Sequence, residues 1–241
     1  MTFYKQNVII LLGRKEEIKT KCGICGLEFT YDDQRAVNPF TKPRSEGAKY
    51  YYNLWHFNVE RCPHCDFVAK KVSSTYNKKI VEDEKYQGIK EMDIIKELNE
   101  ARPNRVESYL LAAYYYESIG DTLNNAKCLL QAGDLLYAEL MYWDEYVLDD
   151  GDSISAIISK RHYNELKGFA DNIFNTAIER LENFVKDNPN DIDAVLLLGG
   201  TLCDGDKVQA IKGSRYLNSL KNMSLNSAQK VTLDWLFENL I

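Results

Sequence analysis

The sequence contains no hydrophobic run long enough to cross a membrane. Its longest runs of aliphatic residues, Val8–Leu12 and Ala194–Leu198, are five residues each, whereas a membrane-spanning helix needs about 20. Val8–Leu12 is also too short for the hydrophobic region of a signal peptide, and no small-residue cleavage site follows it. We therefore expect a cytoplasmic chain that does not contact a membrane.

The sequence also lacks the usual signatures of a catalyst. Gly13 has no earlier glycine to form a phosphate-binding loop, and neither G-x-S-x-G nor H-E-x-x-H occurs. Only three histidines are present. Carboxylates are numerous after residue 80, but the solvent-facing surface of charged helices accounts for them. We expect a protein that is not an enzyme, with no catalytic residues, no bound organic cofactor and no small-molecule substrate.

Charge is distributed unevenly along the 241 residues. Residues 1–80 carry 14 Lys/Arg and 8 Asp/Glu, a net charge of +6, whereas residues 81–241 carry 16 and 28, a net charge of −12. The sign changes where the hydrophobic pattern becomes helical, which indicates a domain boundary near residue 80. The cations before this boundary either screen a cluster of thiolates or meet an anionic partner.

Four of the six cysteines form two C-x2-C pairs. Cys22 and Cys25 form the first, Cys62 and Cys65 the second, and 36 residues separate the two pairs. A pair at this spacing fits a tight turn that presents two sulfurs to one metal ion, and zinc binds four thiolates in a tetrahedron. We predict that these four cysteines bind one structural Zn²⁺. A redox-active pair and an iron–sulfur cluster are the alternatives.

Residues beside the cysteines refine this prediction. Gly26 follows the first pair and can adopt a positive φ, while Asp66, at the same position in the second, is a less favourable but allowed left-handed residue. His64 is either a replacement ligand or a surface imidazole, and His56 either a donor to a ligand or a solvent-facing side chain. His162 has no evident partner. The remaining cysteines, Cys128 and Cys203, lie in helical patterns and are expected in the core.

The local pattern predicts a loop-rich β module followed by helices only. Residues 51–60 alternate as a half-buried strand that leads into the second cysteine pair. From about residue 80 the period is helical. The expected helices are one that ends at Pro103, one over 106–119, one from about 123, one that Ser153 caps, and further ones over 169–187, 192–203, 206–220 and 227–241.

Part of the helical segment resembles a tetratricopeptide repeat. In Tyr109-x2-Ala112-Ala113-x2-Tyr116-x3-Gly120-Asp121, small residues let a neighbouring helix approach and Gly-Asp makes the turn. A second, imperfect match runs over residues 195–210. Two copies predict a tetratricopeptide-like bundle rather than a regular superhelix.

The chain as a whole resembles a bacterial family, a domain of unknown function with a zinc-ribbon-like head and a tetratricopeptide-like tail. The residues that carry the resemblance are Cys22–Gly26, Phe29, Tyr50–Tyr52, Trp55, Cys62–Cys65 and the helical segment Tyr109–Asp121. It covers roughly residues 20–140. It implies a mainly α fold, with a zinc-ribbon-like β module over 1–80 and an all-α domain over 81–241, but no activity.

Two binding functions follow as hypotheses. The helical tail predicts a protein or peptide partner, and the last helix, ending at Ile241, either caps the tail or forms a dimer. The aromatic residues Tyr137, Tyr142, Trp143 and Tyr146 form either part of the core or a binding groove. The alternative is nucleic-acid binding through the head, whose cations are Lys42, Arg44, Lys49, Arg61, Lys70, Lys71, Lys78 and Lys79 and whose aromatic residues lie over Tyr50–Trp55.

Overall fold

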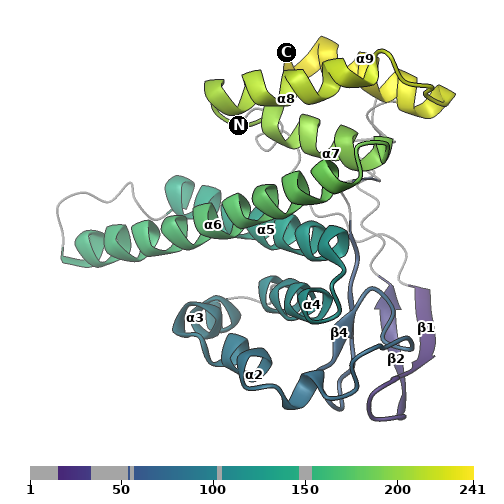
Figure 1. The fold of residues 1–241 in the computed structure, drawn as a ribbon. Helices are drawn as coiled ribbons and strands as arrows, with labels where there is room; N and C mark the ends of the chain where they lie inside the picture. The colour runs from purple at the N-terminus through teal and green to yellow at the C-terminus, as the bar shows by residue number, and fades with distance from the viewer. Residues whose placement is uncertain (1–15, 34–53, 55–56, 102–104, 147–153) are drawn as a thin grey trace. The chain divides into compact units, whose positions relative to one another are not determined.

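The computed structural model describes residues 16–33, 54, 57–101, 105–146 and 154–241, and it is mainly helical, as the sequence predicts (Figure 1). None of the described helices is long and apolar enough to cross a membrane. The elements are β1 (Glu16–Lys21), β2 (Glu28–Asp33), β3 (Glu60–Arg61), β4 (Val68–Ala69), the 3-10 helix η2 (Ile80–Glu82), α2 (Glu84–Glu91), α3 (Asp93–Ala101), α4 (Val106–Ser118), α5 (Thr122–Tyr146), α6 (Ile154–Asp187), α7 (Ile192–Cys203), α8 (Lys207–Leu220) and α9 (Ser227–Leu240).

The strands form two separate pairs that flank the cysteines. β1 pairs with β2, and the first cysteine pair lies in the connection between them. β3 pairs antiparallel with β4, with Arg61 opposite Val68, and the second cysteine pair lies in that connection. Of the strand expected over residues 51–60, positions 51–53, 55 and 56 lie outside the described residues. Leu54 is helical and residues 57–59 have no regular structure, so the strand prediction is wrong there, whereas Glu60 begins β3.

Residue contacts divide the chain into two compact units. One contains residues 19–29 and 59–177, and so joins both cysteine pairs to α2–α5 and to most of α6. The other contains residues 178–241, with the end of α6 and helices α7–α9, and, among the described residues from earlier in the chain, 16–18, 30–33, 54, 57 and 58. The compact units therefore do not divide near residue 80. That residues 1–80 fold independently of residues 81–241 stays a prediction.

Five helices, α4, α5, α7, α8 and α9, begin within a residue or so of the expected positions. The single helix expected before Pro103 is wrong, because Met92 adopts an extended backbone with ψ 127° between α2 and α3. Apolar residues there recur every three positions, short of the 3.6-residue turn, so an unbroken helix would rotate them away from the core. The break lets Tyr86 on α2 and Ile95 on α3 both be fully buried.

The helices expected on either side of residue 168 are instead one continuous helix, α6, of 34 residues. Buried positions continue through it at helical spacing, from Leu166 and Ala170 to Ala177 and Leu181. Gly168 interrupts neither the backbone nor this pattern. A glycine inside a helix costs about 1 kcal/mol relative to alanine, which is too little to end a helix that tertiary packing supports.

α4 is the centre of the unit that contains the cysteines, and α5 packs beside it. Ala112 on α4 and Ala126 on α5 are completely buried, so the two backbones approach closely. Gly120 makes the turn between the helices with φ 74°. The buried side-chain amide of Asn125 donates to the carbonyl oxygen of Ala113, 2.8 Å away, and fixes the register of the pair. This helix–turn–helix is the one that the sequence predicts.

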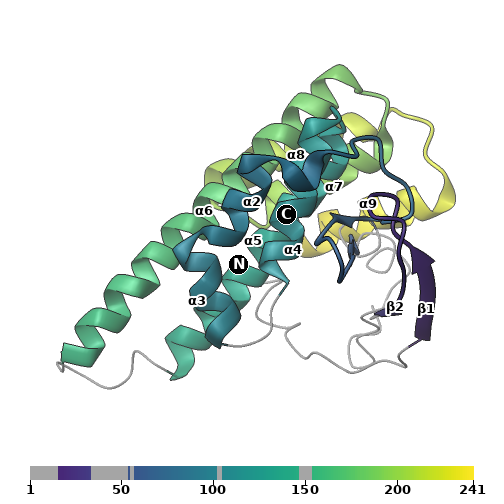
Figure 2. The same ribbon diagram turned by 90° about the horizontal axis from the view of Figure 1, so that it is seen from below.

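α7 and α8 form the second helical hairpin, in the other unit, and α9 packs against α7 (Figure 2). The backbones are in close contact, because a Cβ atom on Gly213 would lie 2.6 Å from the carbonyl oxygen of Gly199. The side-chain amide of Gln229 on α9 donates to the carboxylate of Asp193 on α7 at 2.9 Å. Both hairpins match the expected turn positions, and a tetratricopeptide-like repeat relation between them stays a prediction.

Candidate metal centre

The first cysteine pair lies in a tight turn closed by backbone hydrogen bonds. The N–H of Cys22 donates to the carbonyl oxygen of Leu27 and the N–H of Gly26 to that of Cys22, both at 3.0 Å. Gly26 has φ 73°, as its sequence position predicts. The N–H of Ile24 points at the Cys22 sulfur, 3.4 Å away.

The second pair forms the same two backbone hydrogen bonds as the first. The N–H of Cys62 donates to Phe67 at 2.9 Å, and the N–H of Asp66 donates to Cys62 at 3.0 Å. Asp66 has φ 60° and is the only residue other than glycine with a positive φ in the described part of the chain. The two turns therefore present their sulfurs in the same way, as the paired C-x2-C motif predicts.

The four sulfurs of Cys22, Cys25, Cys62 and Cys65 form one cluster. All four lie within 4.8 Å of one another. The Cys22 and Cys65 sulfurs are 3.6 Å apart, and those of Cys25 and Cys62 are 3.7 Å apart. A tetrahedron with metal–sulfur bonds of about 2.3 Å has edges of roughly 3.8 Å, whereas a disulfide would require about 2.05 Å. The cluster is therefore positioned to hold one metal ion.

The four cysteines differ in their exposure to solvent. Cys22 and Cys62 are buried, Cys65 is half-buried and Cys25 is exposed. The N–H of Leu27 lowers the pKa of the Cys25 thiol, whereas burial raises the pKa of Cys62 and Cys65. Metal binding therefore has to displace protons from Cys62 and Cys65. Four thiolates around one ion leave no coordination position for a substrate.

Of the three histidines, none joins the cluster among the residues that the structure describes. The His64 side chain is exposed, with its ring centroid 6.3 Å from that of Phe29. His56 lies outside the described residues. The expectation that His162 has no partner is wrong, because its Nδ1 lies 3.1 Å from a carboxylate oxygen of Glu97 and so connects α6 to α3.

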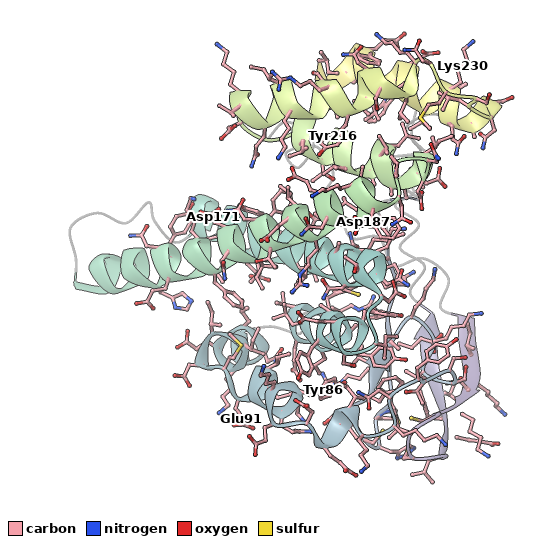
Figure 3. The ribbon with its side chains drawn as sticks, viewed as in Figure 1. Tyr86, Glu91, Asp171, Asp187, Tyr216 and Lys230 are labelled. Atoms are coloured by element: carbon pink, nitrogen blue, oxygen red, sulfur yellow. The ribbon has the colours of Figure 1, made fainter. Side chains whose placement is uncertain are left out.

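The turns over Cys22–Gly26 and Cys62–Asp66 are called the first and second knuckle below. A tyrosine of α2 hydrogen-bonds to the backbone of the second knuckle. The hydroxyl of Tyr86, labelled in Figure 3, accepts a hydrogen bond from the N–H of Val68 at 3.0 Å and donates one to the carbonyl oxygen of Asp66 at 2.8 Å. Tyr86 is completely buried, and burial raises its pKa. Its hydroxyl therefore keeps its proton and satisfies two backbone groups that would otherwise be unpaired in the interior.

Two consecutive tyrosines of α4 hold the chain that follows this knuckle. The hydroxyl of Tyr116 accepts from the N–H of Lys70 at 2.9 Å, and that of Tyr115 accepts from the N–H of Tyr76 at 3.1 Å. Phe67, completely buried, packs edge-on against the Tyr115 ring with centroids 5.0 Å apart. The sequence shows these tyrosines only as helix-core residues. Nothing in their spacing indicates that their hydroxyls support a metal centre.

A network of charged side chains also ties the second knuckle to the helices. Arg61 donates to Asp66 at 3.0 Å and to Glu107 on α4 at 2.9 Å. Lys90 on α2 binds the other oxygen of Asp66 at 2.7 Å, and the amide of Asn99 binds Glu107 at 2.8 Å. Partial burial alone would raise the pKa of Asp66, but Lys90 and Arg61 outweigh it and lower that pKa.

The cations that the sequence suggests for nucleic-acid binding differ in whether the structure describes them and whether they are ion-paired. Arg61 is engaged by two carboxylates, so it does not contribute a free positive charge. Lys42, Arg44, Lys49 and the aromatic segment over Tyr50–Trp55 lie outside the described residues, except for Leu54. The side chains that are described and exposed are Lys70, Lys71, Lys78 and Lys79.

The aromatic cluster of α5 is described only at Tyr137. Its hydroxyl donates to Asp171 on α6 (labelled in Figure 3), and its ring packs edge-on against Phe174 with centroids 5.9 Å apart. Tyr137 thus contributes to the contact between α5 and α6. The side chains of Tyr142, Trp143 and Tyr146 lie outside the described residues. Cys128 and Cys203 are buried in helices, as predicted.

The fold and the four cysteines define a mainly helical protein with a cysteine module that is positioned to hold a metal ion. No protein-family model, no curated protein and no solved structure matches the chain. The bacterial family with a zinc-ribbon-like head therefore stays a resemblance carried by short motifs. The function is therefore inferred from the residues of this chain alone.

Proposed function

We propose that this chain is a non-catalytic interaction protein, in which a structural Zn²⁺ stabilises a helical body that binds a protein partner. The carrying observation is the four-sulfur cluster together with its attachment to α2 and α4. The separations of 3.6 and 3.7 Å between sulfurs fit a zinc tetrathiolate. Zinc bound in this way contributes its binding free energy to folding rather than to chemistry.

The partner surface that we propose lies on α8. Val208 and Ile211 are three residues apart, so they share one side of the helix, and their exposed fractions are 76% and 56%. The opposite side of α8 is buried through Gly213, Leu217 and Leu220. Val208 and Ile211 thus form a small apolar surface on the outer side of a helix whose opposite side is packed in the core. A helix or loop of another protein can cover a surface of this kind.

Metal content and cobalt substitution test the zinc assignment. We expect one zinc ion per purified chain, and replacement by Co²⁺ should give the visible absorption of a tetrahedral thiolate site with charge-transfer bands. Cys62→Ser should abolish this stoichiometric binding, and Cys128→Ser, which changes a buried cysteine outside the cluster, should not. A brown protein that contains iron and sulfide would contradict zinc.

Affinity capture with paired variants tests the partner surface. A protein retained stoichiometrically by the wild type should be lost from the double variant Val208→Glu/Ile211→Glu and kept by Lys207→Glu. Both changes lower the net charge by 2, and all three residues are exposed on α8. Capture that is equal for all three proteins, or no stoichiometric capture at all, would contradict the proposal.

A further inference from the structure

The segment over residues 70–79, here called the basic loop, leads from β4 to η2. It contains four lysines, Lys70, Lys71, Lys78 and Lys79, and no acidic residue. All four lysines are exposed. Near its centre Tyr76 has an exposed fraction of 86%, the largest among the exposed large hydrophobic residues that the structure describes. The loop therefore combines a concentrated positive charge with an uncovered aromatic ring.

The backbone of the basic loop is held in place. The N–H groups of Lys70 and Tyr76 donate to the hydroxyls of Tyr116 and Tyr115, and these two rings lie 5.2 Å apart on α4. Positions 70 and 76 are thus fixed beside one another, and the N–H of Ser74 closes a turn between them by donating to Lys71 at 3.1 Å. The lysines of the basic loop therefore lie on a short segment whose backbone is fixed on both sides of the turn.

The first cysteine knuckle supports the same loop. The N–H of Gly23 donates to the carbonyl oxygen of Val72 at 2.8 Å. A Cβ atom on Gly23 would lie 3.0 Å from a methyl carbon of Thr75 and 3.1 Å from the Ser73 carbonyl oxygen, so the loop rests directly on the knuckle. Since the loop is already ordered, a ligand that binds Tyr76 does not have to restrict a flexible segment.

We propose that the basic loop binds single-stranded nucleic acid, with Lys71, Lys78 and Lys79 at phosphates and Tyr76 stacked on a base. An exposed ring that is flanked by cations matches the combination of stacking and charge by which proteins hold single strands. A duplex hides the faces of its bases, so Tyr76 would add nothing to duplex binding. The net charge of −12 over residues 81–241 repels phosphates, which favours the basic loop over the helices as the binding site of an anionic ligand. This inference goes beyond the proposed protein partner and does not depend on it.

Fluorescence anisotropy with labelled oligouridylate, oligoadenylate and a duplex of the two tests the inference on the zinc-loaded full chain. Tyr76→Ala should weaken binding of the single strands by roughly 5- to 150-fold, the range for the loss of one stacked base. Tyr76→Phe should retain it. Lys71→Gln and Lys78→Gln should each reduce the slope of log affinity against log salt by about 0.7.

Lys230→Gln is the matched control, because Lys230 is an exposed lysine on α9, in the other compact unit (Figure 3). It should leave affinity and salt slope unchanged. Equal losses for Lys230→Gln and Lys71→Gln would overturn the proposal, as would single-strand binding that is insensitive to Tyr76→Ala or no binding at low salt. Equal affinity for polyglutamate would also overturn it, since that polymer offers charge without bases.

Discussion

Asp66 adopts in the second knuckle the left-handed backbone conformation that Gly26 adopts in the first. For a residue with a Cβ atom this conformation costs roughly 1–2 kcal/mol. The Asp66 carboxylate is bound by Arg61 and Lys90. Those contacts offset part of the backbone cost and connect the turn to α2. A residue that looks unfavourable in the turn is therefore useful to the surrounding structure.

Gly26→Ala should test the backbone requirement of the first knuckle. Space is available, because no atom lies within 4 Å of the position that a Cβ atom on Gly26 would take, so the only penalty is the φ of 73°. We expect the free energy of unfolding of the zinc-loaded protein to fall by about 1 kcal/mol. Gly88→Ala, at an equally open position inside α2, should instead raise it by up to about 1 kcal/mol. Urea denaturation measures both, and a stabilising Gly26→Ala would contradict the assigned turn.

Tyr86→Phe should test whether the tyrosine hydroxyl supports the second knuckle. The change leaves the buried N–H of Val68 and the carbonyl oxygen of Asp66 without their partner. We expect a loss of about 1–3 kcal/mol in the free energy of unfolding. Tyr114→Phe removes a hydroxyl that donates to Asp83 at the surface and should cost about 0.5 kcal/mol. Equal losses for the two variants would mean that the Tyr86 hydroxyl has no special role.

Between elements, the closest packing is in the α7–α8 hairpin. A Cβ atom on Gly213 would meet backbone atoms, the Gly199 carbonyl oxygen at 2.6 Å and the Cys203 nitrogen at 2.8 Å. Backbone atoms cannot rotate aside as the end of a side chain can. The two helices can therefore approach this closely only while residue 213 has no side chain.

Gly213→Ala should accordingly separate α7 from α8. We expect the melting temperature to fall, with a loss of about 1–3 kcal/mol, the usual range for an overpacked interior. Gly168→Ala, also inside a helix but with no atom within 4 Å of the added Cβ position, should be neutral or stabilising. Calorimetry distinguishes the two. If Gly213→Ala melts at the wild-type temperature, the close approach of the helices is wrong.

The sequence predicts these elements unevenly, for physical reasons. Helices with sharp caps are placed well, as at α8 and α9, where Asp206 and Asn226 form capping boxes. The break at Met92 and the continuity through Gly168 are missed, because burial against other helices decides them rather than local propensity. The four clustered cysteines are predictable, since their spacing alone defines the turns.

The supports of the metal centre are not predictable from the sequence in the same way. Tyr86, Tyr115 and Tyr116 reach their backbone partners from 18 to 46 positions away in the sequence. Arg61, which the sequence presents as one of several exposed cations, is committed to Asp66 and Glu107. Such contacts depend on how α2 and α4 pack on the knuckles, and no short pattern specifies them.

For the whole molecule, the compact units run across residue 80, where the sequence predicts a domain boundary, and that boundary stays a prediction. The sequence indicates an independent head over residues 1–80. In the structure, the residues that hold the sulfurs share one compact unit with α2–α5. We therefore infer that the four-cysteine cluster and α2–α4 fold as one unit, separately from α7–α9.

Amide hydrogen exchange, measured by mass spectrometry on peptides before and after removal of the metal with a chelator, tests this claim most directly. We predict that removal causes amides of α2 and α4, within residues 84–118, to lose protection together with those of the knuckles. Amides of α7–α9, within residues 192–240, should keep it, because a different compact unit contains them. Loss of protection confined to residues before 80, with α2 and α4 unchanged, would contradict the claim and restore an independent head.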